Sequence, residues 1–396
     1  MNRNTEETAP SFIPFARPSL GPEERDLVIR VLESGWLTSG RYAEEFEKAF
    51  QEYLGVPFAR AVNSATAGLH LSLEALGIQP DTWVITSPYT FTATAEVLRY
   101  LGAHPLFVDI EPQTLNLDPR GVEEALERSG KPISAILPVH LAGRMCSMEP
   151  LTDLSRRFGI PLVEDAAHAF PVYQRGKAAG TFGNAGVFSF YATKTITTGE
   201  GGMVVTPSEK IAERVSMMRL HGIDRKAWDR YTSNRRQAWE YDVVAAGYKY
   251  NLSDLCAALG LEQLKKADSF LRRRKEIAAF YFEQLADQDY LLLPEKTPEH
   301  AWHLFILQLL PDALTLDRNA FADALLARGI GTSVHYKPLH MMTYYRNLYG
   351  YKPEDFPVSL RTYQHCLSLP IYPGLRDVEA ERVVEAVRAV GRQARR

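Results

Sequence analysis

Short apolar runs alternate with helix-like segments between about residue 56 and residue 206. Several of these runs are apolar throughout, as strands are when both faces of a sheet are covered. We predict strands over residues 83–86, 105–109, 134–139, 161–164, 186–190 and 203–206. The segments between them predict helices over residues 66–76, 92–101, 119–127 and 148–158. This alternation indicates a largely parallel sheet, which binds ligands at the carboxyl ends of its strands.

The pattern changes after residue 222. Residues 222–249 are polar and aromatic and include Arg235 among several basic residues, and a loop of this length is usually functional or disordered. Helical periodicity then runs from residue 251 to about residue 280. Towards the C-terminus we predict strands over 302–310 and 331–335, and helices over 318–328 and 378–390.

The length of 396 residues fits two domains better than one core. We predict an α/β fold with a large domain over residues 15–262 that carries the mostly parallel sheet. The remainder, residues 263–396, is predicted to be a smaller C-terminal α+β domain.

The overall charge is nearly balanced. With 45 basic and 48 acidic residues, the formal net charge is −3, which favours neither a nucleic-acid binder nor a membrane-surface binder.

Residues 1–18 lack the apolar core of a signal peptide, and the longest apolar stretch, 304–310, is far shorter than a membrane span. The three widely separated cysteines indicate free thiols in a reducing compartment. We therefore expect a cytoplasmic protein.

The first candidate site segment is the helix start after residue 62. Asn63 and Ser64 are good N-cap residues, and small residues up to position 68 would let a ligand approach the unpaired N–H groups of the first turn. Such a helix start suits a phosphate group. An ordinary capped helix is the alternative, since short capping patterns are common.

The second segment is an apolar strand that ends in Glu164 and Asp165. A carboxylate at the carboxyl end of a strand is well placed to meet a cationic heterocycle. Pyridoxal phosphate (PLP) requires such a partner, because a carboxylate on its ring nitrogen favours the protonated pyridinium, which accepts electrons from the adjacent carbon. The alternative is an acid that complements a helix dipole.

The third segment delivers Ser189 and then Lys194 from one strand, followed by three glycines within eight residues. A lysine packed among apolar groups has a lowered pKa and becomes a nucleophile and proton carrier. A solvated surface lysine is the alternative. Two rings, Tyr89 and Phe91, follow the strand over 83–86, and one of them could stack on a pyridine ring, with core packing as the alternative.

No one of these segments is specific, but together they contain the parts of a PLP site. The string Glu164-Asp-Ala-Ala-His, then Phe188-Ser-Phe-x-x-x-Lys194, then Gly199-Glu-Gly-Gly, resembles the DegT/DnrJ/EryC1/StrS family of sugar aminotransferases. The resemblance runs from about residue 15 to the C-terminus. It implies a fold-type I PLP enzyme that acts on a nucleotide-linked keto sugar.

The resemblance also implies how the cofactor phosphate is held. Ala65 and Thr66 would bind it through backbone and hydroxyl groups, with Ser189 beside them. Asn251 would reach it from a partner subunit, which implies a homodimer with shared active sites.

For the cofactor ring, the resemblance implies four contacts. Phe91 would stack on the ring, Asp165 would pair with its nitrogen, and Lys194 would bind it as a Schiff base. His168 would reach the phenolic oxygen, at a position where many family members have glutamine.

The substrate side is less defined. The resemblance places His335 and Tyr336 near the substrate, and we expect Arg235 in the 222–249 loop to bind the nucleotide diphosphate, since arginine grips phosphate oxygens with two N–H groups. An exposed solvated loop is the alternative reading of that arginine.

The predicted reaction moves an amino group from L-glutamate to C4 of a UDP-linked 4-keto sugar, because the closest likeness within the family is to members that make UDP-4-amino-4-deoxy-L-arabinose. Amination at C3 or C4 of a dTDP- or GDP-linked sugar, or of a cyclitol, is an alternative. A PLP sugar dehydratase of the same fold is disfavoured, because those relatives carry histidine where Lys194 stands. A non-catalytic regulatory homologue is the remaining alternative. The product would enter lipopolysaccharide or other polysaccharide biosynthesis.

Overall fold

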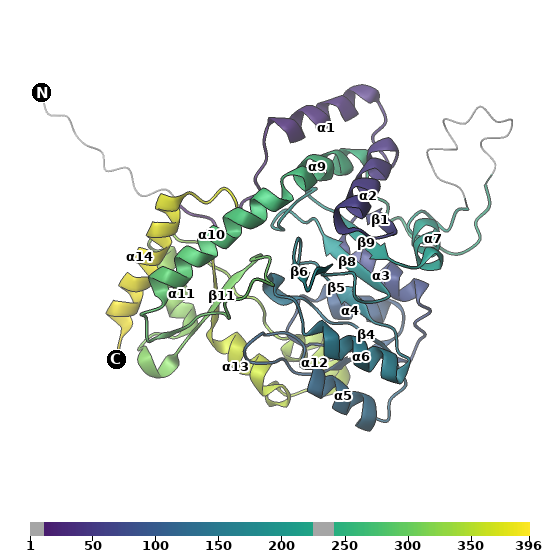
Figure 1. Ribbon diagram of the computed structural model, residues 1–396. Helices are drawn as coiled ribbons and strands as arrows, with labels where there is room; N and C mark the ends of the chain where they lie inside the picture. The colour runs from purple at the N-terminus through teal and green to yellow at the C-terminus, as the bar shows by residue number, and fades with distance from the viewer. Residues whose placement is uncertain (1–11, 225–240) are drawn as a thin grey trace, which may run out of the picture.

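The computed structural model describes residues 12–224 and 241–396, and a sheet organises the larger part of them (Figure 1). Four strands are ordered β1-β9-β8-β5, and three are ordered β3-β2-β4. Backbone pairing of Ile136 with Leu162 and of Val139 with Asp165 joins β4 to β5, so the two groups continue each other. The strands are β1 (Phe58–Val62), β2 (Trp83–Thr86), β3 (His104–Phe107), β4 (Ile133–Ile136), β5 (Val163–Asp165), β8 (Ala185–Ser189) and β9 (Gly202–Thr206).

Strand directions confirm the predicted mostly parallel sheet. β2 pairs in parallel with β3 and β4, and β5 pairs in parallel with β8. β9 is antiparallel to both of its neighbours, β1 and β8. The carboxyl ends of β2, β5 and β8 therefore lie at one edge of the sheet.

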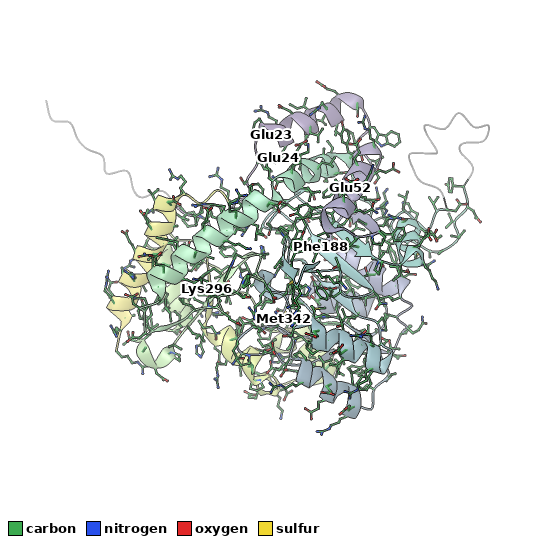
Figure 2. All side chains as sticks on the ribbon, viewed as in Figure 1. Glu23, Glu24, Glu52, Phe188, Lys296 and Met342 are labelled. Carbon is green, nitrogen blue, oxygen red and sulfur yellow. The ribbon has the colours of Figure 1, made fainter. Side chains whose placement is uncertain are left out.

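Helices cover both faces of the sheet, because successive strand residues point to opposite sides. Val187 and Val204 pack under α3 (Ala65–Ala75), α4 (Ala93–Tyr100) and α7 (Glu209–Met218). Phe188, which lies in the middle of the molecule in Figure 2, and Met203 pack on the other face. That face is covered by α2 (Arg41–Leu54), α5 (Pro119–Arg128), α6 (Met148–Phe158) and α9 (Asp254–Lys265).

A second hydrophobic core lies at the left of Figure 1. It is built by α10 (Ala267–Leu285), α11 (Arg318–Leu326) and α14 (Asp377–Ala394) on the small sheet β10 (Leu291–Leu292), β11 (Phe305–Leu309) and β12 (Cys366–Leu369). Ile13, from the opposite end of the chain, is fully buried in this core. Two further helices, α12 (Thr343–Tyr349) and α13 (Pro357–His365), lie between β11 and β12 in the sequence. The domain boundary at residues 262/263 stays a prediction.

The structure corrects two of the sequence predictions and adds elements near the N-terminus. Residues 331–335 are not a strand, because only Ser333 pairs, with Ser368 of β12. The helix predicted from 251 to 280 is two helices, α9 and α10. The N-terminal region holds elements that we did not predict, α1 (Pro22–Ser34), α2 and β1. α1 packs along α9, and its Glu23 and Glu24 (Figure 2) both accept hydrogen bonds from Lys266, which follows α9 directly.

No helix in the described ranges is long and apolar enough to cross a membrane.

Candidate active site

A cavity of about 600 Å³ opens where β2, β5 and β8 end. Most of the predicted site residues line it: Ala65, Thr66, Phe91, Asp165, His168, Ser189, Lys194, His335 and Tyr336. Asn251 lies elsewhere, in a groove with Arg60 and Arg219, and its amide donates to the Ser39 hydroxyl at 2.7 Å. Arg235 lies outside the described residues.

The start of α3 forms one wall of the cavity. Ser64 caps the helix by accepting the backbone N–H of Ala67 at 3.1 Å. The backbone N–H groups of Ala65 and Thr66 have no hydrogen-bond partner in the described part of the chain, and both residues face the cavity. Unpaired N–H groups at the positive end of a helix bind anions, so this wall suits a phosphate.

Two glycines allow α3 to lie this close to the sheet. A Cβ added to Gly202 at the start of β9 would lie 2.7 Å from the Ala65 nitrogen. A Cβ on Gly68 would lie 2.7 Å from a methyl carbon of Val187. Gly202 therefore sets the position of the anion-binding turn, whereas Gly68 serves helix-to-sheet packing.

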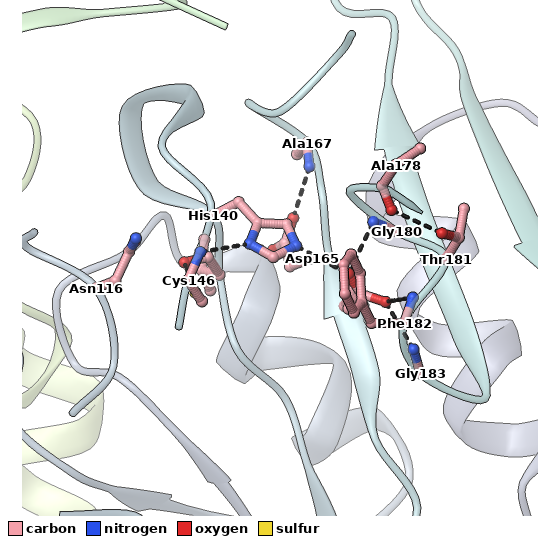
Figure 3. Close-up of polar contacts among 12 residues, drawn as sticks. Asn116, His140, Cys146, Asp165, Ala167, Ala178, Gly180, Thr181, Phe182 and Gly183 are labelled. Atoms are coloured by element: carbon pink, nitrogen blue, oxygen red, sulfur yellow. Dashed lines mark hydrogen bonds and ion pairs between the residues drawn. The ribbon is translucent and has the colours of Figure 1, made fainter. Parts of the chain in front are cut away.

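Asp165 presents a buried carboxylate at the end of β5, and it is only 4% exposed. Its Oδ2 accepts the Thr94 hydroxyl at 2.8 Å. Its Oδ1 accepts the Ala167 N–H at 3.1 Å, as Figure 3 shows. Burial raises the pKa of Asp165, while these bonds and the nearby Lys194 oppose the rise. A turn follows Asp165, so the carboxylate does not serve as a helix-terminal acid.

The neighbouring acid, Glu164, has a different task that the sequence did not reveal. It is fully buried and accepts three backbone N–H groups of the turn after β7 (Lys177–Ala178), from Gly180, Phe182 and Gly183, at 2.5–2.8 Å. It also accepts the Nε2 proton of His140 at 3.0 Å, because the His140 Nδ1 accepts the Cys146 N–H (Figure 3). Glu164 therefore fixes the loops behind β5 while Asp165 faces the cavity.

Lys194 follows β8 after a tight turn, in which its backbone N–H donates to the Tyr191 carbonyl at 2.9 Å. Its amine has no hydrogen-bond partner among the described residues. Burial lowers the pKa of Lys194 from 10.5 to about 8, and the Asp165 carboxylate opposes the fall. The amine is therefore partly neutral near physiological pH, as a nucleophile must be.

His168 is held in one tautomer. Its Nδ1 accepts the backbone N–H of Ala142 at 3.3 Å, so the proton of the neutral ring lies on Nε2. Nε2 points to the Tyr336 hydroxyl at 3.2 Å, inside the cavity. Burial lowers the pKa of His168 well below its ordinary value, and the positive charge of Lys194 adds to this effect. His168 is therefore a neutral hydrogen-bond donor to the cavity.

The two aromatic residues after β2 have separate positions. Tyr89 is 1% exposed and donates to the His335 carbonyl at 2.6 Å, so it belongs to the core. Phe91 is 56% exposed and its ring lines the cavity. A large exposed apolar ring inside a cavity indicates a surface that a ligand covers.

The part of the chain after α10 contributes two histidines. His335 is held by a 2.8 Å contact between its Nδ1 and the Ser368 hydroxyl, and burial, with the charge of Lys194, lowers the pKa of His335 to about 4. The sequence predictions missed His303, whose ring centroid lies 4.5 Å from that of His168. Its signal was its place in Ala301-Trp-His-Leu-Phe305, a further stretch of the sequence that resembles the family.

These features fit pyridoxal phosphate. The cavity combines a helix start with free N–H groups, an exposed ring, a buried carboxylate and an unpaired amine of lowered pKa. Ala65, Thr66 and Ser189 would hold the phosphate. Phe91 would stack on the face of the ring, and Asp165 would pair with the ring nitrogen.

Comparison with known proteins gives matches over nearly the whole chain. The DegT/DnrJ/EryC1/StrS aminotransferase family matches residues 18–388. An uncharacterized protein of Methanocaldococcus jannaschii is 46% identical over 96% of this chain and 98% of its own length. The spore coat polysaccharide biosynthesis protein SpsC of Bacillus subtilis is 43% identical over 96% of this chain and 97% of its own length.

Solved structures of aminotransferases also match this chain over nearly its whole length. Helicobacter pylori PseC, an aminotransferase involved in the biosynthesis of pseudoaminic acid, superposes with a TM-score of 0.88 at 30% identity, over 97% of this chain and 100% of PseC. Spr1654 of Streptococcus pneumoniae, in its PMP form, superposes with a TM-score of 0.88 at 31% identity, over 96% of this chain and 99% of that one.

Proposed function

Because this chain belongs to the DegT/DnrJ/EryC1/StrS aminotransferase family, we propose that it transfers the amino group of L-glutamate to C4 of a UDP-linked 4-keto sugar. The predicted fold class, the cofactor and the enzyme class are confirmed: the protein is a PLP-dependent sugar aminotransferase. The residue roles, the donor, the nucleotide and the carbon that is aminated are the proposal.

One observation supports the residue roles most strongly. Asp165 ends β5 and Lys194 follows the neighbouring parallel strand β8, and both line the cavity that the exposed Phe91 ring also lines. When bound, PLP supplies an electron sink next to the carbon that loses or gains a proton.

The chain's own groups then have distinct tasks. Lys194 attaches the cofactor and afterwards moves the proton, as base in the first half-reaction and as acid in the second, for which a pKa of about 8 is suitable. Asp165 keeps the ring nitrogen protonated. His168 donates its Nε2 proton to the phenolic oxygen, as the Gln of other family members would.

The sugar substrate is proposed from the relatives. PseC is involved in the biosynthesis of pseudoaminic acid, and SpsC in that of a spore coat polysaccharide. An amino sugar for a surface polysaccharide is therefore the product class that we propose. Lys194 disfavours the dehydratase alternative, which needs histidine at that position.

A homodimer with shared sites forms part of the proposal. Asn251 does not line the cavity of its own chain, although it pairs with Val62 two residues before the α3 cap. In a dimer it would reach the phosphate site of the partner. Mixing inactive Lys194→Ala and Asn251→Ala chains should restore activity, because half of the sites in a mixed dimer then carry neither substitution.

The substrate proposal is tested with purified enzyme, PLP and L-glutamate, offered a UDP-linked 4-keto sugar and, in parallel, dTDP- and GDP-linked keto sugars and a keto cyclitol. We expect a UDP-linked 4-amino sugar by mass spectrometry and NMR, with glutamine a poorer donor than glutamate. Turnover of another member of this panel alone would overturn the UDP and C4 assignment but leave the aminotransferase chemistry in place.

A further inference from the structure

Two threonine hydroxyls stand behind the Asp165 carboxylate. The Thr94 hydroxyl donates to Asp165 Oδ2 at 2.8 Å, and the Thr90 and Thr94 hydroxyl oxygens are 3.0 Å apart. All three side chains are buried, with exposures of 2% for Thr90, 0% for Thr94 and 4% for Asp165. No sequence pattern had marked either threonine.

The hydrogen atoms that link Thr90, Thr94 and Asp165 have a single arrangement while Asp165 is ionised. An ionised carboxylate only accepts hydrogen bonds, so Thr94 must give its one proton to Asp165. The Thr94 oxygen then accepts the proton of Thr90. The two hydroxyls form a relay whose dipoles both point towards the carboxylate, and hydrogen bonds aligned in this way strengthen each other.

The relay also connects two walls of the cavity. Thr94 lies in the first turn of α4, and its backbone N–H donates to the carbonyl of Phe91 at 3.3 Å. Thr90 precedes Phe91 and lines the cavity itself. The same helix start therefore fixes the exposed ring and one oxygen of the carboxylate.

We propose that Thr94 is a positioning residue, which orients Asp165 and keeps its carboxylate charged so that the cofactor ring nitrogen stays protonated. The inference rests on the role proposed for Asp165 above.

The physical reason is that Asp165 has few other stabilising contacts. Burial raises the pKa of its carboxyl group, and the bond from Thr94 is the largest of the effects that oppose the rise. Within the described residues, the only other hydrogen bond to the Asp165 carboxylate comes from the Ala167 N–H. Without the Thr94 hydroxyl, the proton shared by carboxylate and ring nitrogen shifts towards the carboxylate, and the ring loses its positive charge.

The test uses holoenzyme reconstituted with PLP that carries ¹⁵N at the ring nitrogen, whose NMR shift reports its protonation. The variants are Thr94→Val, which removes the hydroxyl at similar volume, and Thr94→Ser, which keeps it. Asp165→Asn gives the reference for a lost carboxylate. Thr206→Val is the matched control, because Thr206 is equally buried and donates to the Asn184 carbonyl at 2.7 Å at the far end of β9.

We expect Thr94→Val to move the ¹⁵N signal towards its position in Asp165→Asn and to lower kcat about tenfold with little change in KM, as for the loss of a hydrogen bond to a charged group. Thr94→Ser should restore both, and Thr206→Val should change neither. If Thr94→Val does not fold, Thr94→Ala removes the same hydroxyl and is measured in its place.

The two proposals fail in different ways. If Asp165→Asn moves the ¹⁵N signal but the Thr94 variants leave it unchanged, the positioning role of Thr94 is wrong and the role of Asp165 stands. If Asp165→Asn itself leaves the signal unchanged, the role proposed for Asp165 is wrong and the inference on Thr94 falls with it.

Discussion

The Lys194 amine and the Asp165 carboxylate line one cavity, yet no ion pair joins them in the described part of the chain. Each nevertheless affects the other, since the carboxylate raises the pKa of Lys194 and the Lys194 charge lowers the pKa of Asp165. Opposite charges that share a cavity without contact leave room for a third group between them. The proposed mechanism places the cofactor ring in that space, and the following predictions test its parts.

Replacing Lys194 should remove catalysis and not merely weaken binding. We expect Lys194→Ala to lower turnover by roughly 10²–10⁴-fold or more, because the proton carrier is gone. The variant should also lack the visible absorption of the lysine-linked cofactor. Turnover and absorption spectra of the purified variant check this, and near-normal transamination would contradict it.

The lowered pKa of Lys194 predicts a pH-dependent stability in the cofactor-free protein. The folded pKa is about 8 against an ordinary value of 10.5, so the unfolded chain binds the proton more tightly. Lys194 therefore destabilises the folded protein below pH 8. This destabilisation decreases as the pH rises from 8 to 10.5.

The apo Lys194→Met variant isolates this effect. Below pH 8 it should melt higher than the wild-type apoprotein by about 2 °C or more, and the difference should shrink towards pH 10.5. Thermal unfolding of both proteins across this range provides the measurement. A difference in melting temperature that does not vary with pH would show that the amine is not buried as described.

His168 should tolerate one replacement and not another. His168→Gln keeps an N–H donor near the Nε2 position, so we expect activity within a few-fold of wild type. His168→Leu removes the donor and should cost roughly tenfold in kcat/KM. Steady-state kinetics of both variants check this. Equal losses of kcat/KM would mean that the His168 side chain serves packing and does not donate a hydrogen bond.

Gly68 and Gly202, at the contact between α3 and the sheet, provide a matched pair of substitutions. Gly202→Ala would push a methyl group to 2.7 Å from the Ala65 nitrogen, so it should weaken cofactor binding by about tenfold. Gly68→Ala meets Val187 at the same distance and should instead lower the melting temperature. Titration of both apoproteins with PLP distinguishes the two effects, and unchanged cofactor affinity in Gly202→Ala would contradict the proposed anion site.

The sequence predicted those parts of the fold and site that depend on local pattern. The limits of β2 and α6 match the predicted ranges, because an apolar run and a capped amphipathic segment each define their own ends. The motif positions at the ends of β2, β5 and β8 could be found because a parallel sheet brings those ends together.

What the sequence could not predict depends on contacts between distant segments. Whether Tyr89 or Phe91 faces the cavity is decided by the distant His335 and Cys366, because the Tyr89 hydroxyl donates to the His335 carbonyl and contacts the Cys366 sulfur. Likewise, Thr94 has no local signature, since it acts on the site through Asp165, which lies more than 60 positions away in the chain. We predicted a strand over residues 331–335, but only Ser333 finds a pairing partner there, with the distant Ser368.

The proposed mechanism depends above all on a covalent bond between Lys194 and the cofactor. Reduction of the holoenzyme with borohydride, followed by proteolysis and mass spectrometry, locates the attached group directly. We predict a phosphopyridoxyl group on the peptide that contains Lys194 and on no other lysine, and its loss after prior incubation with L-glutamate. The group on a different lysine, or an unmodified Lys194 in a yellow enzyme, would contradict it.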